Sequence, residues 1–337
     1  MTRQVLVVGP SWVGDMVMAD ALFRTLAARG AVVDVVAPGW SLPILERMPS
    51  VRRGFELKAG HGEFALGARR ALGRKLRSYE YEQAIVLPRS FKSALVPFFA
   101  RVPMRTGFRG EMRYGLINDR RAFDRVRLDQ TIKRFVWLGL APGERLPDEL
   151  PRPSLVPVAD AVAATCARLD LMPEPPTVAL LPGAEYGPAK CWPLPHFRAL
   201  AERLHASGAN VWVLGSDKDR EAGEFITAGG IGRNLAGETA LAEACDLLAC
   251  CDAAVTNDSG LMHVAAAVGC WVVAIYGSSS PAFTPPLTDR ATVMYRALDC
   301  SPCFQRECPL GHLDCLNGIS PAEVMARLQP RLVPPST

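Results

Sequence analysis

The stretch VLVVGPSWVGDMVMADALFRTLAA, residues 5–28, decides the class of fold to which the chain belongs. Its first four residues are apolar and end at Gly9, and residues 19–28 carry apolar side chains at helical spacing. A compact apolar strand, a glycine turn and a helix together make a βα unit. Strands that alternate with helices predict an α/β fold with a parallel sheet covered on both faces. Further strands are expected over 32–37 and 83–87, with a helical stretch over 67–77 between them.

The chain is long enough for two domains, and its second half repeats the pattern of the first. At 337 residues it exceeds the size at which a single hydrophobic core usually stops growing. Residues 146–158, LPDELPRPSLVPV, hold four prolines, which disfavour regular structure and are typical of a linker. Beyond this linker, helices are expected over 159–169, 195–207, 220–226 and 261–268, and strands over 177–181, 211–214, 253–256 and 271–276.

We therefore predict two doubly wound, Rossmann-like domains, residues 1–155 and 156–320, that face a central cleft. A C-terminal segment, 321–337, is expected to form a helix and a tail that can pack back on the first domain. Ligands of open α/β sheets bind at the carboxyl ends of the strands, so the cleft is the expected binding site. The architecture alone names no reaction.

Composition and charge exclude several classes of protein. Hydrophobic residues make up 49% and charged residues 21% of the chain, which is globular usage. The net charge of +4 is too small to suggest a nucleic-acid partner. The apolar stretch 94–100 is far shorter than the roughly 20 residues that span a bilayer, and no export signal precedes residue 5. We expect a protein of the cytoplasm, at most peripheral on a membrane.

One region of the first half is strongly basic. Residues 89–134 contain twelve Lys and Arg against four Asp and Glu. An anionic partner is expected there, with Lys92, Arg109 and Arg113 as candidate contacts. The alternative is a basic face that only meets solvent.

The turn GPSWVGDM, residues 9–16, is the first candidate site. It has the Gly-x4-Gly spacing of a P-loop but lacks the Lys and Ser or Thr that must follow, and it is not Gly-x-Gly-x-x-Gly either. Asp15 would repel a phosphate. Its carboxylate can instead accept a proton from a sugar hydroxyl, and the alternative is an N-cap for the following helix.

Two segments of the second half have the residue types of a phosphate and sugar site. In PGAEYGPAKCWP, residues 182–193, the glycines allow close approach and Lys190 can place its charge on a diphosphate, unless it is an ordinary surface lysine. In TNDSGLMHVAAA, residues 256–267, Asp258, Ser259 and Gly260 stand at a strand-to-helix turn whose N–H groups suit phosphate. Asp258 is expected to meet sugar hydroxyls or the helix N–H groups. His263 can donate to a phosphate or pack in the core.

Four cysteines cluster near the C-terminus. Cys300, Cys303, Cys308 and Cys315, with His312 among them, provide enough ligands for a structural metal, but their spacing is not a standard paired Cys-x2-Cys set. Reduced thiols are the alternative, and disulfides do not suit a cytosolic protein.

Successive blocks of the chain resemble one family. PSWVGDM, LPRSFKSALVPFFA, RTGFRGEMRYGLIND, PGAEYGPAKCWP, LAGET, TNDSGLMHVAAA and YGSSSPAFTPPL are similar, in order and spacing, to signatures of the ADP-heptose:lipopolysaccharide heptosyltransferase II family, a branch of glycosyltransferase family 9. They extend from residue 10 to about residue 287. SFKSALVPFF and RGEMRYGL favour type II over type I.

The resemblance implies a GT-B fold with the donor on the C-terminal domain and the acceptor on the N-terminal domain. The implied reaction transfers L-glycero-D-manno-heptose, with inversion, from ADP-heptose to heptosyl-Kdo2-lipid A at the inner membrane surface, in lipopolysaccharide core biosynthesis. Asp15 matches the general base and Lys190 the diphosphate lysine. Asp219 replaces a longer ribose-binding glutamate, and Thr239 matches an adenine-side position. Asp258, Ser259, Gly260 and His263 match the heptose- and phosphate-binding block.

The residues and the resemblance lead to one mechanism. Asp15 removes the acceptor proton while Lys190, His263 and the helix N-terminus stabilise the departing ADP, so that no metal or other cofactor is required. Heptosyltransferases I and III, which differ in acceptor, remain alternatives. A noncatalytic nucleotide-binding protein is a third alternative, but it would have no need of Asp15.

Overall fold

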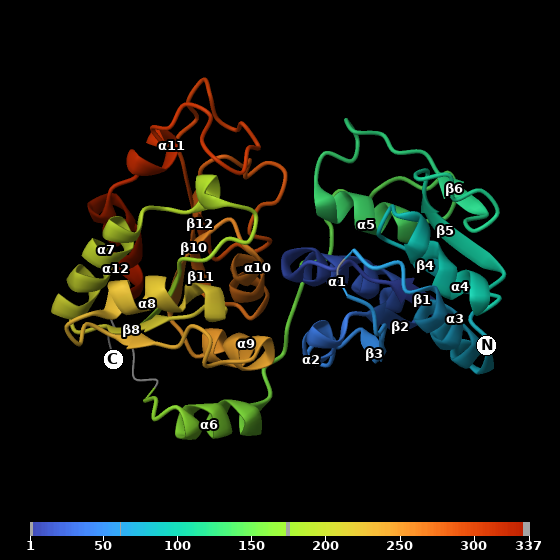
Figure 1. Cartoon of the computed structure of the whole chain (residues 1–337), viewed down its shortest axis with the longest axis horizontal. Helices are drawn as coiled ribbons and strands as arrows, with labels where there is room; N and C mark the ends of the chain where they lie inside the picture. The colour runs from blue at the N-terminus through green and yellow to red at the C-terminus, as the bar shows by residue number, and fades with distance from the viewer. Residues whose placement is uncertain (1–2, 61, 173–175, 333–337) are drawn as a thin grey trace. The chain divides into compact units, whose positions relative to one another are not determined.

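We describe the protein from a computed structural model, in which residues 3–60, 62–172 and 176–332 are described (Figure 1). The chain forms two compact units, Met1–Ser154 and Leu155–Thr337. The division falls one residue before the boundary expected from the proline-rich linker. Each unit is an α/β domain with its own six-stranded parallel sheet, so the predicted fold class is confirmed.

The sheet of the first unit has the strand order β3-β2-β1-β4-β5-β6. This is the order of the Rossmann fold, in which the direction of chain progression reverses between the first and fourth strands. β1 is almost wholly buried because it lies in the middle of the sheet. The strands are β1 (Gln4–Val8), β2 (Val32–Ala37), β3 (Val51–Glu56), β4 (Gln83–Val86), β5 (Met104–Phe108) and β6 (Asp119–Arg121).

The helices of the first unit pack in two groups. α1 and α5 contact one another, as do α3 and α4. One hydrophobic cluster lies between the sheet and the pair α3 and α4, and it contains Leu6 of β1, Leu76 and Val96. The helices are α1 (Val13–Ala28), α2 (Leu42–Leu45), α3 (Leu66–Lys75), α4 (Leu95–Phe99) and α5 (Thr131–Gly139).

The second unit repeats the same topology. Its order β12-β11-β10-β7-β8-β9, read from β9, is again that of the Rossmann fold. Its strands are β7 (Thr177–Leu181), β8 (Asn210–Val213), β9 (Arg233–Asn234), β10 (Ala253–Asn257), β11 (Trp271–Tyr276) and β12 (Ala291–Tyr295). Its helices are α6 (Ala159–Arg168), α7 (Leu194–Ala206), α8 (Arg220–Thr227), α9 (Leu241–Ala249), α10 (Gly260–Ala267), α11 (Asp314–Asn317) and α12 (Pro321–Leu332).

The C-terminal helix belongs to the second unit. α12 packs on α7, and its Val324 and Leu328 are fully buried in the same core as Trp192 and Phe197. Packing of this segment on the first domain stays a prediction. The apolar face of this amphipathic helix, with Val324 and Leu328, is buried in the core of the second unit. The expected tail, 333–337, lies outside the described residues.

The structure extends one predicted helix and adds sheet edges. α1 begins at Val13, six residues before the periodic stretch expected from the sequence, because both Gly14 and Met16 are buried in its first turn. β3, β6 and β9 carry polar and exposed side chains, so they lack the apolar signal of the central strands. Among the described residues, no helix has the length and apolar character needed to cross a bilayer.

Candidate active site

The candidate donor site of the second unit lies at the point where its strand order reverses. β7 and β10 are neighbours in the sheet, and the segments after their carboxyl ends carry Lys190 and Asp258. In open α/β sheets this switch point is where ligands bind. The two sequence blocks that predicted phosphate and sugar chemistry therefore meet, although 68 positions separate these two residues.

Lys190 and Asp258 form an ion pair. The Lys190 ammonium donates to Oδ2 of Asp258 at 2.5 Å, and the two side chains are only 17% and 6% exposed. The ammonium also lies 5.1 Å from the ring centre of Tyr186. Lys190 is therefore not the ordinary surface lysine of the alternative interpretation. The partner of Asp258 in this structure is Lys190, and its contact with sugar hydroxyls stays a prediction.

Asn257 holds the two segments together, a role that sequence reasoning missed. Its side chain is fully buried, accepts from the backbone N–H of Trp192 at 2.9 Å and donates to the carbonyl of Pro182 at 2.6 Å. These bonds fix both ends of the loop that carries Lys190. An asparagine at the end of an apolar run is the only sequence signal of this role.

His263 lies beside the pair on α10. It is 5% exposed, and its Nδ1 has no hydrogen-bond partner among the described residues. Burial lowers the pKa of His263 to about 4, with Asp258 opposing and Lys190 adding to this shift. At neutral pH the ring is therefore uncharged and can donate one hydrogen bond. The ring is buried like a core residue, and it also lies next to the charged pair, where it can donate to a phosphate.

A third segment, after β11, brings further unpartnered hydroxyls. Ser278 and Ser279 are 1% and 5% exposed, and neither Oγ has a hydrogen-bond partner within the described part of the chain. The N–H of Ser278 donates to the carbonyl of Ala189, which places this segment against the lysine loop. The sequence block YGSSSPAFTPPL gave the family resemblance but no role for these serines. A run of serines directly after a buried strand was the available signal.

The predicted ribose and adenine contacts lie after the outer strands. Oδ2 of Asp219 accepts from the N–H and hydroxyl of Ser216 at 2.8 and 2.9 Å, so it closes a turn at the start of α8. Gly183 and Gly215 lie so close to this carboxylate that a Cβ on either would be within 2.8 Å of it. Thr239 has a buried hydroxyl without a partner among the described atoms. Their binding roles stay predictions.

The N-terminus of α10 lacks a side-chain cap, so its first backbone N–H groups are available to a ligand. Ser259 is the N-cap residue, but its side chain makes no capping hydrogen bond, and its Oγ lies 3.5 Å from that of Thr256. Gly260 is the first helical residue. The first-turn N–H groups of a helix lack intrahelical partners, so this end suits an anion, as predicted.

In the first unit, Asp15 lies in the first turn of α1. The N-cap is Trp12, so Asp15 is the third helical residue and the N-cap alternative for it is wrong. The carboxylate is half-buried and lies close to Arg134, because its charge is among those that raise the pKa of Arg134. Burial is the largest influence on that pKa and lowers it. The charges of Arg89 and Arg125 lower it further, and the charge of Asp129 raises it. Its role as a base stays a prediction.

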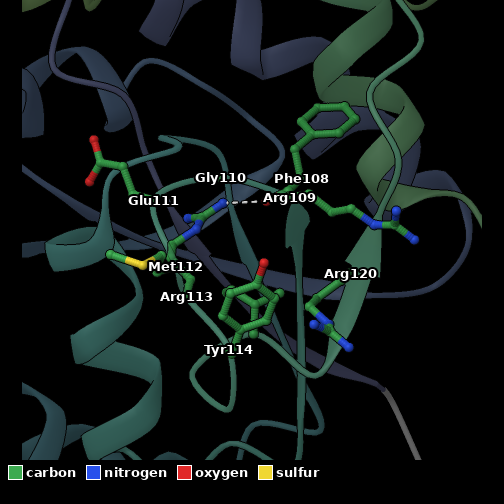
Figure 2. Close-up of a pocket in the computed structure, with 9 residues that line it drawn as sticks. Phe108, Arg109, Gly110, Glu111, Met112, Arg113, Tyr114 and Arg120 are labelled. Atoms are coloured by element: carbon green, nitrogen blue, oxygen red, sulfur yellow. Dashed lines mark hydrogen bonds between the residues drawn. The ribbon is translucent and has the colours of Figure 1, made fainter.

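Figure 2 shows a pocket of about 370 Å³ in the basic region of the first unit. Arg109 and Arg120 line it from exposed positions, and the guanidinium of Arg120 lies 5.3 Å from the ring centre of Tyr114. The pocket is lined by Phe108, Arg109, Gly110, Glu111, Met112, Arg113, Tyr114, Ile117 and Arg120. An open, cationic and aromatic pocket can receive an anionic sugar.

Arg113 differs from the expectation of an exposed acceptor contact. It is 3% exposed and donates to the carbonyls of Pro88 at 2.8 Å and Phe108 at 2.5 Å. Burial lowers its pKa. Its guanidinium therefore joins the segments after β4 and β5, and Figure 2 shows it turned to the backbone. Lys92 is half-buried in the turn Phe91–Ala94 and is not among the residues that line the pocket.

The clustered cysteines form no ligand set in this structure. Within the described ranges no group of three or more His, Cys, Asp or Glu side chains is arranged to hold a metal, and the cysteines are free thiols. His312 Nδ1 instead accepts from the N–H of Asp314 at 2.9 Å. The loop braces the lysine loop, since the carbonyls of Phe304 and Arg306 accept from the Tyr186 hydroxyl and the Ala189 N–H.

Two Rossmann-like units, one with a cation, a carboxylate and buried hydroxyls at its switch point, have the architecture of a GT-B type glycosyltransferase. The chain belongs to glycosyltransferase family 9 (heptosyltransferase), whose model matches residues 69–314. The predicted family and the assignment as a glycosyltransferase are confirmed.

Close relatives cover nearly the whole chain. Lipopolysaccharide heptosyltransferase 2 of Escherichia coli is 46% identical over 98% of this chain and 99% of its own. Lipooligosaccharide heptosyltransferase 2 of Haemophilus influenzae is 44% identical over 86% of this chain and 88% of its own. The solved structure of E. coli ADP-heptose lps heptosyltransferase II has a TM-score of 0.88, with 44% identity over 98% of each chain.

Proposed function

We propose that the protein transfers L-glycero-D-manno-heptose from ADP-heptose to the first heptose of the lipopolysaccharide inner core, with inversion at the anomeric carbon. The observation that carries this proposal is the buried Lys190–Asp258 ion pair at the switch point, with His263 beside it. The family and the names of its close relatives support the same reaction.

Lys190 is suited to the donor diphosphate because its orientation is already fixed. An ammonium has three N–H donors, and Asp258 uses one of them. The others can bind phosphate oxygens in a poorly solvated site, where a charge-assisted bond is strong. Asp258 keeps the lysine charge balanced until the anionic donor arrives. It then lies next to the heptose hydroxyls, which can donate to its second oxygen.

Neutral donors complete the site. An uncharged His263, the hydroxyls of Ser278 and Ser279 and the N-terminus of α10 all present hydrogen-bond donors without a full charge. Such groups stabilise the charge that develops on the departing ADP, so the reaction needs no metal or other cofactor in our proposal. Thr239 and Asp219 would serve the nucleoside end.

Asp15 is the proposed general base. It follows the central strand β1 at the switch point of the first unit, where an acceptor hydroxyl is expected. The pocket of Arg109 and Arg120 would pair with a carboxylate or phosphate of the heptosyl-Kdo2-lipid A acceptor. Because that acceptor is a lipid, the protein is expected to work in the cytoplasm and at the inner membrane surface.

The acceptor distinguishes this proposal from its alternatives. Purified protein is incubated with ADP-heptose and either Kdo2-lipid A or its monoheptosylated form, and ADP release and product mass are measured. We expect heptose transfer only to the monoheptosylated acceptor. Transfer to Kdo2-lipid A would indicate a type I enzyme, and transfer only to a diheptosylated acceptor would indicate type III. Binding of ADP-heptose without turnover on any acceptor would indicate a noncatalytic protein.

A further inference from the structure

The pair of helices α3 and α4 forms a surface that the proposed reaction does not use. The two helices lie side by side (Figure 1) and cross at Gly73, where an added Cβ would lie 2.6 Å from the Cβ of Phe99 and 2.7 Å from the carbonyl of Val96. The close crossing fixes the outer sides of both helices as one continuous surface.

This surface carries positive charge without acidic residues. Neither of the segments 64–79 and 91–110 contains an Asp or Glu. Arg70, Arg74 and Arg77 follow one another at intervals of four and three residues, so they share one helix face. Arg101 joins them from the end of α4, because its charge is among the causes that lower the pKa of Arg77, after partial desolvation and before the charges of Arg74 and Arg70.

The four arginines are not neutralised within the protein. All are exposed, and none makes an ion pair among the described residues. Arg77 donates to the carbonyl of Phe99, which leaves Arg70, Arg74 and Arg101 with no side-chain partner in the described structure. Like charges at helical spacing destabilise a helix, so this cluster costs folding free energy that an external anion would offset.

Exposed apolar side chains flank the same cluster. Leu66 lies one turn before Arg70 and is 46% exposed, and Phe98 lies one turn before Arg101 and is 42% exposed. The guanidinium of Arg105 lies 5.8 Å from the ring centre of Phe98. Arginine beside an exposed aromatic ring is the pattern of a surface that rests on lipid headgroups while the ring enters the acyl boundary.

We infer that the α3–α4 surface, with Arg70, Arg74, Arg101, Leu66 and Phe98, docks the protein on an anionic lipid bilayer. This rests on the proposed function for its purpose, since a lipid-borne acceptor lies in such a bilayer. It assigns the contact to a surface distinct from Asp15 and from the pocket of Arg109 and Arg120. Charge complementarity favours anionic lipid over a neutral surface, and the exposed side chains of Leu66 and Phe98 favour a bilayer over a free polyanion.

The test is sedimentation of the full chain with vesicles of phosphatidylethanolamine and phosphatidylglycerol, and in parallel with vesicles of phosphatidylcholine alone. Wild type is expected to bind the anionic vesicles, and less so as salt increases. Each basic residue near such a surface contributes about fivefold, so the triple variant Arg70→Gln, Arg74→Gln, Arg101→Gln should bind about a hundredfold more weakly. Phe98→Ser should weaken binding severalfold with unchanged salt dependence.

A matched variant keeps the test specific. Arg203→Gln, Arg290→Gln and Arg327→Gln remove the same charge from exposed positions of the second unit and should leave vesicle binding unchanged. Equal loss in both triples, equal binding to phosphatidylcholine, or displacement by an RNA oligonucleotide that binds the same arginines more tightly would each overturn the proposal.

The same variants separate this proposal from the proposed function. The α3–α4 triple should transfer heptose to a lipid-free acceptor at the wild-type rate but lose transfer to acceptor embedded in anionic vesicles. If no form of the protein transferred heptose, the proposed function would fail while the vesicle measurements would still decide the docking surface.

Discussion

The ammonium of Lys190 lies 2.5 Å from the carboxylate of Asp258, and the two residues lie in the segments that follow β7 and β10, the strands between which the sheet of the second unit reverses its order. This ion pair joins the loop after β7 to the segment after β10, so that both contribute to one site. Because both side chains are largely buried, neither can be removed without leaving its partner charge poorly solvated.

Replacing Lys190 by Ala should impair use of the donor. The loss of a charge-assisted bond to the diphosphate is expected to lower kcat/KM for ADP-heptose by about 10- to 150-fold, which is measured by steady-state kinetics with the donor varied. The matched control is Lys218→Ala, since Lys218 lies nearby in the sequence but is 75% exposed and pairs with Glu185. If the two variants behaved alike, Lys190 would have no special role toward the donor.

Asp15→Asn should retain ADP-heptose binding and lose most transfer. The amide keeps the shape of the side chain in the first turn of α1 but cannot accept the acceptor proton, which is expected to reduce kcat by about 100- to 10,000-fold. Calorimetry of donor binding and turnover on the monoheptosylated acceptor check the two parts. Asp160→Asn changes an exposed acid in the first turn of α6 and should be nearly silent. Near-normal turnover by Asp15→Asn would exclude this residue as the base.

Arg109→Ala combined with Arg120→Ala should raise the KM for the acceptor and leave ADP-heptose affinity unchanged. Both residues line the pocket of the first unit from exposed positions, so the protein should remain folded. Acceptor binding by wild type should also weaken with salt. An unchanged acceptor KM in the folded double variant would contradict the assignment of this pocket.

Arg113→Ala should act on stability instead. Its guanidinium satisfies the carbonyls of Pro88 and Phe108, and leaving them without donors should lower the free energy of unfolding by about 2 to 4 kcal/mol. Urea denaturation of Arg113→Ala beside the Arg109 and Arg120 double variant measures the difference. Equal stability of the two variants would show that the backbone contacts of Arg113 contribute little.

The buried carboxyl of Asp20 should make the protein less stable as pH rises. Burial raises its pKa to about 6 from 3.8, with the N–H of Ser154 and the charge of Arg24 opposing. The folded state therefore holds this proton more tightly than the unfolded state, so the contribution is complete below pH 3.8 and is lost as pH rises to 6. The loss is about 3 kcal/mol. Asp20→Asn should remove this dependence, as measured by urea denaturation between these pH values, and a parallel curve for the variant would contradict it.

His263 should give the opposite dependence. Its folded pKa of about 4 lies below the ordinary 6.5, so the unfolded state binds the proton more tightly and stability falls as pH decreases from 6.5 to 4. The decrease is about 3 kcal/mol. His263→Gln should remove it, whereas His205→Gln changes an exposed ring and should not. Donor affinity should show no titration near pH 6.5, since the ring is already neutral there.

Much of the fold could be read from local patterns. The central strands β1, β7, β10 and β11 are apolar runs that end in glycine, proline or polar turns, and this signal depends only on neighbours in the sequence. Edge strands such as β6 and β9 lack it, because one side of each meets solvent and accepts charged residues. The beginning of α1 was missed for a related reason, since Gly14 and Asp15 are poor helix formers that tertiary burial overrides.

The sequence by itself determined the class of fold, the family and the residue types of the site, because each of these depends on composition and spacing along the chain. Only the tertiary structure decided which of these residues meet. It paired Lys190 with Asp258, gave Asn257 the task of joining their loops, left the hydroxyls of Ser278 and Ser279 buried without partners, and turned Arg113 from the surface to the backbone. The physical reason is that a parallel sheet brings the carboxyl ends of distant strands to one edge, and the burial and partner of each side chain follow from that convergence.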